Sequence, residues 1–214
     1  MIRSYLKQIE KEIGESEPER HNDKIQQIAA WIISENLAGR RPAVNFICTH
    51  NSRRSQFSQT WFAAVQSYFG LDIADSFSGG TEVTACNERT IAALERTGFN
   101  VSASNGDNPV YSLSGDLDGS EIRLWSKVYD DESNPSEKFA AVMTCDHADQ
   151  NCPFIPGADV RIPLTYTDPK FADGTDEEAS AYDNTCKMIA VDMMRVWKLV
   201  RKDLQNANPI DSES

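Results

Sequence analysis

The sequence predicts an α/β fold of three layers, in which a mainly parallel four-stranded sheet is flanked by helices. Short apolar runs alternate along the chain with longer segments whose apolar residues recur at helical spacing. Such alternation is typical of a parallel sheet covered by helices on both sides. The chain has 214 residues, enough to bury one core without disulfides or metal ions. In such folds, active sites lie at the carboxyl ends of the strands.

Two amphipathic segments open the chain. Apolar residues recur at helical spacing in residues 2–13 and 25–37, and a stretch with Gly and Pro separates them. The second segment stops near Gly39, a typical residue at the end of a helix. We therefore predict a helical hairpin in front of the main domain. The predicted division is a helical extension (1–40), a main domain (41–205) and a flexible tail (206–214).

Within the main domain, strands and helices alternate. Apolar runs predict strands at residues 43–49, 73–80 and 139–145. Helical spacing predicts helices at residues 52–69, 87–99 and 176–203. The loop-rich segment 102–135 holds two further apolar runs, which predict an inserted β-hairpin. Residues 160–175 contain two prolines, and we expect them to be irregular.

The composition narrows the classes of function. The net charge is −12, from 33 carboxylates against 21 Lys and Arg, so neither nucleic acid nor an anionic membrane is an expected partner. No apolar run approaches the ~18 residues of a membrane span, and the charged N-terminus is not a signal peptide. We therefore expect a cytoplasmic protein. Its five cysteines are an odd number, which favours catalytic or redox chemistry over a disulfide framework.

The clearest candidate site is a cysteine at the end of the first predicted strand. Cys48 is followed after five residues by Arg54 and Ser55, where a helix is predicted to begin. A loop curled before a helix N-terminus directs backbone N–H groups inward and binds anions. Arg54 adds a two-pronged donor for a tetrahedral oxyanion, and Ser55 can donate to the sulfur, so the surroundings favour a thiolate. The loop residues expected to bind substrate are Thr49, His50, Asn51, Ser52, Arg53 and Ser55. The alternative is an inert, buried cysteine followed by an unrelated helix start.

The stretch FICTHNSRRSQ resembles the phosphate loop of the low-molecular-weight protein tyrosine phosphatase superfamily, written Cys-x5-Arg-Ser. It is most similar to the thioredoxin-coupled arsenate reductases of that superfamily, and the resemblance covers roughly residues 42–200. It implies that Cys48 is the nucleophile and that an Asp-Pro pair far downstream supplies the general acid. Asp168-Pro169 is the matching pair, although alone it would be an ordinary turn dipeptide.

Two further cysteines distinguish a reductase from a phosphatase. Cys145 ends the predicted strand at 139–145, and Cys152 follows seven residues later, before a proline. The resemblance implies a thiol relay through Cys48, Cys145 and Cys152 that thioredoxin regenerates. A disulfide needs close Cα atoms, so residues 146–151, predicted as a short helical turn, would have to loop out. The alternatives are structural cysteines, or metal binding with His147 at a spacing that fits no common zinc pattern.

Some positions differ from the family pattern. Arg53 stands where relatives carry Cys or a small residue, and Gln59 stands where some reductases carry a cation-coordinating glutamate. A bound potassium ion is therefore not expected, and neither is another metal or a cofactor. Our primary prediction is a thioredoxin-dependent arsenate reductase acting on a small oxyanion, arsenate or phosphate. The alternatives are a phosphatase of phosphotyrosine or small aryl phosphates, which uses Cys48, Arg54 and Asp168 alone, and an oxyanion-binding or interaction module without turnover.

Overall fold

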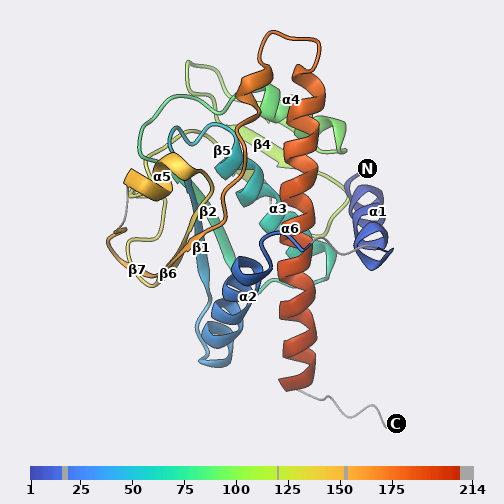
Figure 1. The fold of residues 1–214 in the computed structure, drawn as a ribbon, viewed down its shortest axis with the longest axis vertical. Coiled ribbons are helices and arrows are strands. Elements are labelled where there is room, and N and C mark those ends of the chain that lie inside the picture. The colour runs from blue at the N-terminus through green and yellow to red at the C-terminus, as the bar shows by residue number, and fades with distance from the viewer. Residues whose placement is uncertain (16–18, 120, 152–153, 208–214) are drawn as a thin grey trace.

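Four parallel strands form the central sheet of the computed structural model, which describes residues 1–15, 19–119, 121–151 and 154–207 (Figure 1). Their spatial order is β2-β1-β6-β7, and all three pairings are parallel. The strands are β1 (Ala43–Cys48), β2 (Asp75–Gly80), β6 (Phe139–Met143) and β7 (Ala158–Pro163). The predicted α/β fold class is confirmed.

The two central strands are almost entirely buried, as expected for parallel strands covered on both faces. One face of β1 and β6 contributes to the large core shared with the long helices. The other face, with Ile47 and Met143, forms a smaller cluster that includes Cys48, Cys145 and Ala148. The two candidate thiols therefore lie at the same end of the sheet.

One long C-terminal helix, α6 (Glu178–Ala207), runs along the sheet (Figure 1). The other helices are α1 (Ile2–Glu15), α2 (Asn22–Leu37), α3 (Arg54–Tyr68), α4 (Glu88–Arg96), α5 (Asp146–Asn151) and the 3₁₀ helix η1 (Pro169–Ala172). Among the described residues, helix α6 packs on all of them except α5. Helix α3 packs on β1, β2 and α6, while the short α5 packs on β1 and β6. In the described part of the chain, no helix is long and apolar enough to cross a membrane.

The two predicted N-terminal helices are present, but their predicted packing as a hairpin is wrong. Figure 1 shows α1 and α2 on either side of α6. Helix α1 packs on α6 and α3, and α2 packs on α6 and β7. Their apolar stripes, with Leu6 and Ile28 fully buried, belong to the same core cluster as the main sheet. Because each stripe buries its apolar area against the main core, the extension is part of the fold.

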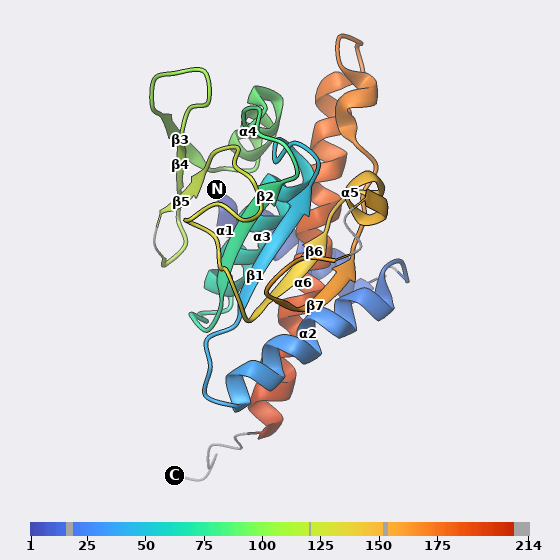
Figure 2. The same cartoon turned by 90° about the vertical axis from the view of Figure 1, so that its left-hand side faces the viewer.

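The predicted inserted hairpin is confirmed and is extended by a third strand. Strands β4 (Tyr111–Ser114) and β5 (Ile122–Leu124) pair antiparallel, and β3 (Asn100–Ala103) adds to β4. Figure 2 shows this small sheet standing apart from the four-stranded sheet. Leu113 and Leu124 are buried and join the main core, which holds the insertion in place.

One prediction at the sheet edge is wrong. Residues 160–175 were expected to be irregular, yet β7 covers part of that segment and pairs with β6. Pro163 is the last residue of an edge strand, where a missing N–H breaks no interior ladder bond. The predicted turn at 146–151 is confirmed as α5. Helix α6 continues through Ala207, two residues into the predicted tail, and residues 208–214 lie outside the described residues.

Candidate active site

The oxyanion loop connects the end of β1 to the start of α3. Cys48 is the last residue of β1 and Arg54 the first of α3, so the five loop residues cross the carboxyl edge of the sheet. In the described part of the chain, no hydrogen bond uses the backbone N–H of His50, Asn51, Ser52 or Arg53 as its donor. Buried N–H groups are rarely left without an acceptor. Consecutive unpaired donors beside a buried thiol are the arrangement expected of an anion-binding loop.

Asn51 shapes the loop and binds the serine that lies beside the thiol. Its φ of 46° lies in the left-handed region, which Asn tolerates better than most residues. Its side-chain oxygen accepts from the Lys127 N–H at 3.0 Å, and its amide donates to Ser55 Oγ at 2.9 Å. Ser55 Oγ lies 3.1 Å from Cys48 Sγ. The Ser55 oxygen accepts from Asn51, and its hydroxyl hydrogen makes no other bond among the described residues, so this hydrogen is available to the sulfur.

Gly80, the last residue of β2, leaves room for the loop to pass. A Cβ at this position would lie 2.7 Å from the Thr49 carbonyl oxygen and 2.8 Å from the Asn51 nitrogen. Both neighbours are backbone atoms, so no side-chain rotation could relieve the contact. A side chain at position 80 would therefore displace the loop itself.

Replacing Ser55 by alanine is expected to lower the rate of Cys48 alkylation by iodoacetamide at pH 7 by roughly three- to tenfold, because the thiolate loses a hydrogen-bond donor. Alkylation is measured by mass spectrometry of the Cys48 peptide. Ser58→Ala is a matched control, since its hydroxyl donates to the Arg54 carbonyl on the same helix. Equal rates in Ser55→Ala and the unaltered protein would contradict this role for Ser55.

Arg54 links the loop to the candidate acid. Its Nη2 donates to Asp168 Oδ2 at 2.6 Å, and its Nη1 donates to the Tyr166 carbonyl at 2.9 Å. Its Nε is buried and has no hydrogen-bond partner among the described residues, so the Nε–H is a donor that a ligand could use. Asp168 also caps η1 by accepting from the Lys170 N–H at 3.1 Å. The structure thus brings Asp168 and the loop together across 114 residues of sequence.

Arg53 lies beside the same candidate acid. Its Nε donates to the Tyr182 hydroxyl at 2.8 Å and lies 3.9 Å from Asp168 Oδ1. Its Nη2 lies 3.7 Å from Asp173 Oδ2. The Asp168 carboxylate therefore has a guanidinium near each oxygen. An oxyanion that enters the loop competes with this carboxylate for Arg54.

The side chains of the other loop residues have partners of their own. Ser52 Oγ donates to the Ala85 carbonyl at 2.6 Å, and His50 Nε2 lies 3.5 Å from Glu82 Oε2. Their backbone N–H groups, rather than their side chains, are the donors left for substrate. A hollow of about 500 Å³ opens beside these residues. Its lining includes His50, Arg53, Tyr111 of the insertion and Lys170.

The second thiol lies next to the loop. Thr49 Oγ1 is 3.5 Å from Cys145 Sγ and 3.3 Å from His147 Nδ1. The Ala148 N–H donates to Cys145 Sγ at 3.4 Å. Cys152 lies outside the described residues, so its place in the site stays a prediction. The residues that are described contain no group of three or more His, Cys, Asp or Glu side chains placed to hold a metal ion.

Two contributors to the site were not predicted. Tyr166 binds Arg54 through its backbone carbonyl, and Lys127 binds Asn51 through its backbone N–H. Lys127 is buried with its ammonium 3.9 Å from the centre of the Trp125 ring, and burial lowers the pKa of Lys127 to about 8. Backbone contacts carry no residue-type signal in a sequence. Only the lysine's place inside an apolar strand-like run could have drawn attention to it.

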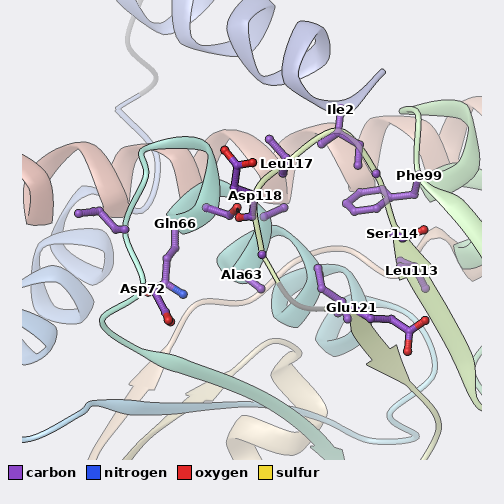
Figure 3. A pocket seen from close by; sticks show the side chains of 16 residues that line it. Ile2, Ala63, Gln66, Asp72, Phe99, Leu113, Ser114, Leu117, Asp118 and Glu121 are labelled. Carbon is purple, nitrogen blue, oxygen red and sulfur yellow. Dashed lines mark hydrogen bonds between the residues drawn. The ribbon is translucent and has the colours of Figure 1, made fainter.

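A separate cavity of about 220 Å³ lies among α1, α3 and the insertion (Figure 3). Figure 3 shows Ile2, Phe99 and Leu113 lining it, with Asp118 and Glu121 nearby. None of the residues that line it belongs to the oxyanion loop. It is therefore distinct from the candidate active site.

Comparison with known proteins supports the predicted resemblance. An arsenate reductase from Halalkalibacterium halodurans is 28% identical over 138 residues, which cover 64% of this chain and 81% of that protein. No family model matches the chain. A low-molecular-weight protein tyrosine phosphatase from T. tengcongensis superposes with a TM-score of 0.47 at 13% identity, covering 73% of this chain and 98% of that one. An arsenate reductase from Archaeoglobus fulgidus superposes with a TM-score of 0.44 at 20% identity, covering 74% and 98%. The resemblance to arsenate reductases is confirmed at this level, and it supports the prediction of an enzyme.

Proposed function

We propose that this chain reduces arsenate to arsenite through a relay of three thiols that thioredoxin regenerates. The observation that carries the proposal is the second thiol beside the oxyanion loop. Cys48 and Cys145 lie at the carboxyl ends of neighbouring strands and share one buried cluster. The register pairs Ile47 with Met143, so the two cysteines are offset by one residue across strands that lie about 4.8 Å apart. A disulfide needs Cα atoms about 4.4–6.8 Å apart. A phosphatase with the same loop has no use for this thiol.

In the first proposed step, the unpaired N–H groups of the loop and Arg54 bind arsenate. The Cys48 thiolate attacks arsenic, a sulfur–arsenic bond forms, and one oxygen leaves as water with a proton from Asp168. Asp168 is bound to Arg54 in the free protein, so an arsenate held by the unpaired donors of the same guanidinium would compete with this carboxylate and lie next to it. That arrangement would place the acid next to the leaving oxygen.

In the following steps, the thiols supply two electrons. The Cys145 thiolate attacks Cys48 sulfur, the sulfur–arsenic bond breaks with its electron pair on arsenic, and arsenite leaves with a Cys48–Cys145 disulfide formed. The Cys152 thiolate then attacks Cys145 and releases the Cys48 thiolate. The dithiol of thioredoxin reduces the resulting Cys145–Cys152 disulfide and is itself oxidised.

Cys145→Ser is expected to abolish thioredoxin-driven arsenate reduction while hydrolysis of an aryl phosphate changes less than about threefold, because only the relay needs a second thiol. The measurements are NADPH oxidation with thioredoxin and thioredoxin reductase, and phenol release from the aryl phosphate. Cys152→Ser is expected to behave in the same way. Cys186→Ser is the control, since Cys186 is buried and its thiol accepts from Trp61 Nε1 at 3.2 Å. If Cys145→Ser reduces arsenate normally, the relay is wrong.

The second candidate function is hydrolysis of an aryl phosphate or phosphotyrosine by the same loop. The hollow beside the loop favours it, because a free oxyanion would leave this volume unused. Tyr111 could stack on an aromatic leaving group there. Side-by-side rates on arsenate with thioredoxin and on an aryl phosphate without it decide between the two functions.

A further inference from the structure

One buried carboxylate ties the N-terminal extension to the C-terminal helix. Asp192 of α6 is fully buried. Its oxygens accept from Arg20 Nη2 at 3.1 Å and from His21 Nδ1 at 2.9 Å. Arg195 lies 3.6 Å from the same carboxylate and donates to the Arg20 carbonyl at 2.7 Å. Residues 20 and 21, which precede α2, are therefore anchored to the middle of α6.

The His21 ring lies against Tyr166. The ring centres are 5.5 Å apart and the planes cross at 89°, an edge-to-face contact. Tyr166 is buried, and its hydroxyl lies close to the Asp192 carboxylate. Burial and the nearby Asp192 carboxylate raise the pKa of Tyr166 well above 10, so the phenol is neutral. The His21 ring packs on one side of the Tyr166 ring, and Asp192 lies near both residues.

The backbone of Tyr166 holds Arg54. Its N–H donates to the Thr144 carbonyl at 3.2 Å, and its carbonyl accepts from Arg54 Nη1 at 2.9 Å. The carbonyl that orients Arg54 thus belongs to the residue against which His21 packs. Two contacts therefore connect the N-terminal extension to Arg54 of the loop: His21 with the Tyr166 ring, and the Tyr166 carbonyl with Arg54.

His21 adopts a backbone conformation that calls for an explanation. Its φ of 60° is left-handed, which is uncommon for a residue other than glycine. It occupies the N-cap of α2, yet its side chain caps no N–H of that helix. The His21 carbonyl accepts the first hydrogen bonds of α2, from the Lys24 and Ile25 N–H groups, while its ring takes no part in the cap and contacts Tyr166 and Asp192 instead.

We propose that His21 is a positioning residue for oxyanion binding, which holds Tyr166 so that its carbonyl orients Arg54 toward the loop. The inference rests on the proposed use of Arg54 as an oxyanion ligand. Because Arg54 contacts the oxyanion both before and during the reaction, a misplaced guanidinium weakens both states. The expected signature is a raised KM for arsenate with little change in kcat.

Two substitutions separate the ring contact from the anchoring bond. In His21→Asn, the asparagine tolerates a left-handed backbone and its amide can still donate to Asp192, but the aromatic ring is removed. We expect the inorganic phosphate concentration that half-protects Cys48 from iodoacetamide to rise roughly three- to tenfold in this variant, with little change in melting temperature. His21→Phe keeps a ring and loses the donor. It should melt at a lower temperature yet show nearly unaltered phosphate protection.

Glu12→Gln is the matched control, because Glu12 also ties the N-terminal extension to α6, through Lys187 at 2.8 Å. It should leave phosphate protection unchanged. Unaltered protection in His21→Asn, or an equal shift in Glu12→Gln, would overturn the inference. Phosphate protection needs no turnover, so a failure of the unaltered protein to reduce arsenate would overturn the proposed function and leave this result standing.

Discussion

Cys48→Ser is expected to lower the rates of arsenate reduction and aryl phosphate hydrolysis by about 10⁴-fold or more, while the protein still folds. The serine hydroxyl is not ionised at neutral pH, so it cannot replace a thiolate that unpaired N–H groups and Ser55 stabilise. The substitution exchanges sulfur for oxygen at a strand end and creates no cavity. The measurements are initial rates on both substrates, with circular dichroism and thermal melting to verify the fold.

Cys86→Ser is the control for this prediction. Cys86 is buried beside the same loop and lines the neighbouring hollow. Burial raises the pKa of the Cys86 thiol well above its usual range, so this sulfur is a poor nucleophile. The variant should keep most of the turnover. Substantial activity in Cys48→Ser, or loss of activity in Cys86→Ser with the fold intact, would contradict the assignment of Cys48 as nucleophile.

Asp168→Asn is expected to lower kcat for arsenate by roughly 10²–10⁴-fold, because an amide cannot protonate the departing oxygen. The affinity for an oxyanion, in contrast to kcat, is not expected to fall. In the free protein, Asp168 is bound to Arg54 at 2.6 Å, and a neutral amide competes less well for the guanidinium. The apparent dissociation constant for phosphate should therefore stay equal or fall. Initial rates and phosphate protection of Cys48 from alkylation measure the two effects separately.

Asp173→Asn is the control for the acid. Asp173 accepts from the Tyr182 hydroxyl at 2.9 Å and lies near Arg53, but it makes no hydrogen bond to Arg54 among the described residues. Its replacement should change kcat by less than about threefold. A rate for Asp168→Asn within that same range would assign the acid role to another group.

The predicted loop and the observed loop agree closely because every component is local. The strand end, the five connecting residues and the helix start occupy consecutive positions, so spacing alone determines their order. The same holds for Cys145, which follows an apolar run typical of a buried strand. Because the carboxyl ends of parallel strands meet at one edge of a sheet, the strand pattern alone predicts that these two thiols lie at the same edge.

The errors arose where tertiary contacts outweigh local signals. The N-terminal helices were predicted correctly as helices and wrongly as a hairpin. An apolar stripe predicts that one face of a helix is buried, but it does not predict which element packs against that face. Strand β7 was missed because its proline argues against a strand unless the strand lies at an edge. Edge position depends on the order of strands in space, which local patterns do not encode.

The sequence by itself determined the α/β class, the helix and strand types of most segments, and the cysteine–arginine loop, because periodicity and short spacing express local physics. Only the tertiary structure decided that Arg54 binds the Asp168 carboxylate and the Tyr166 carbonyl, and that His21 packs on Tyr166. These contacts join residues that lie more than a hundred positions apart, and they form because packing around α6 brings those segments together. A short motif thus contains most residue types of the candidate site, while their alignment depends on how the whole chain packs.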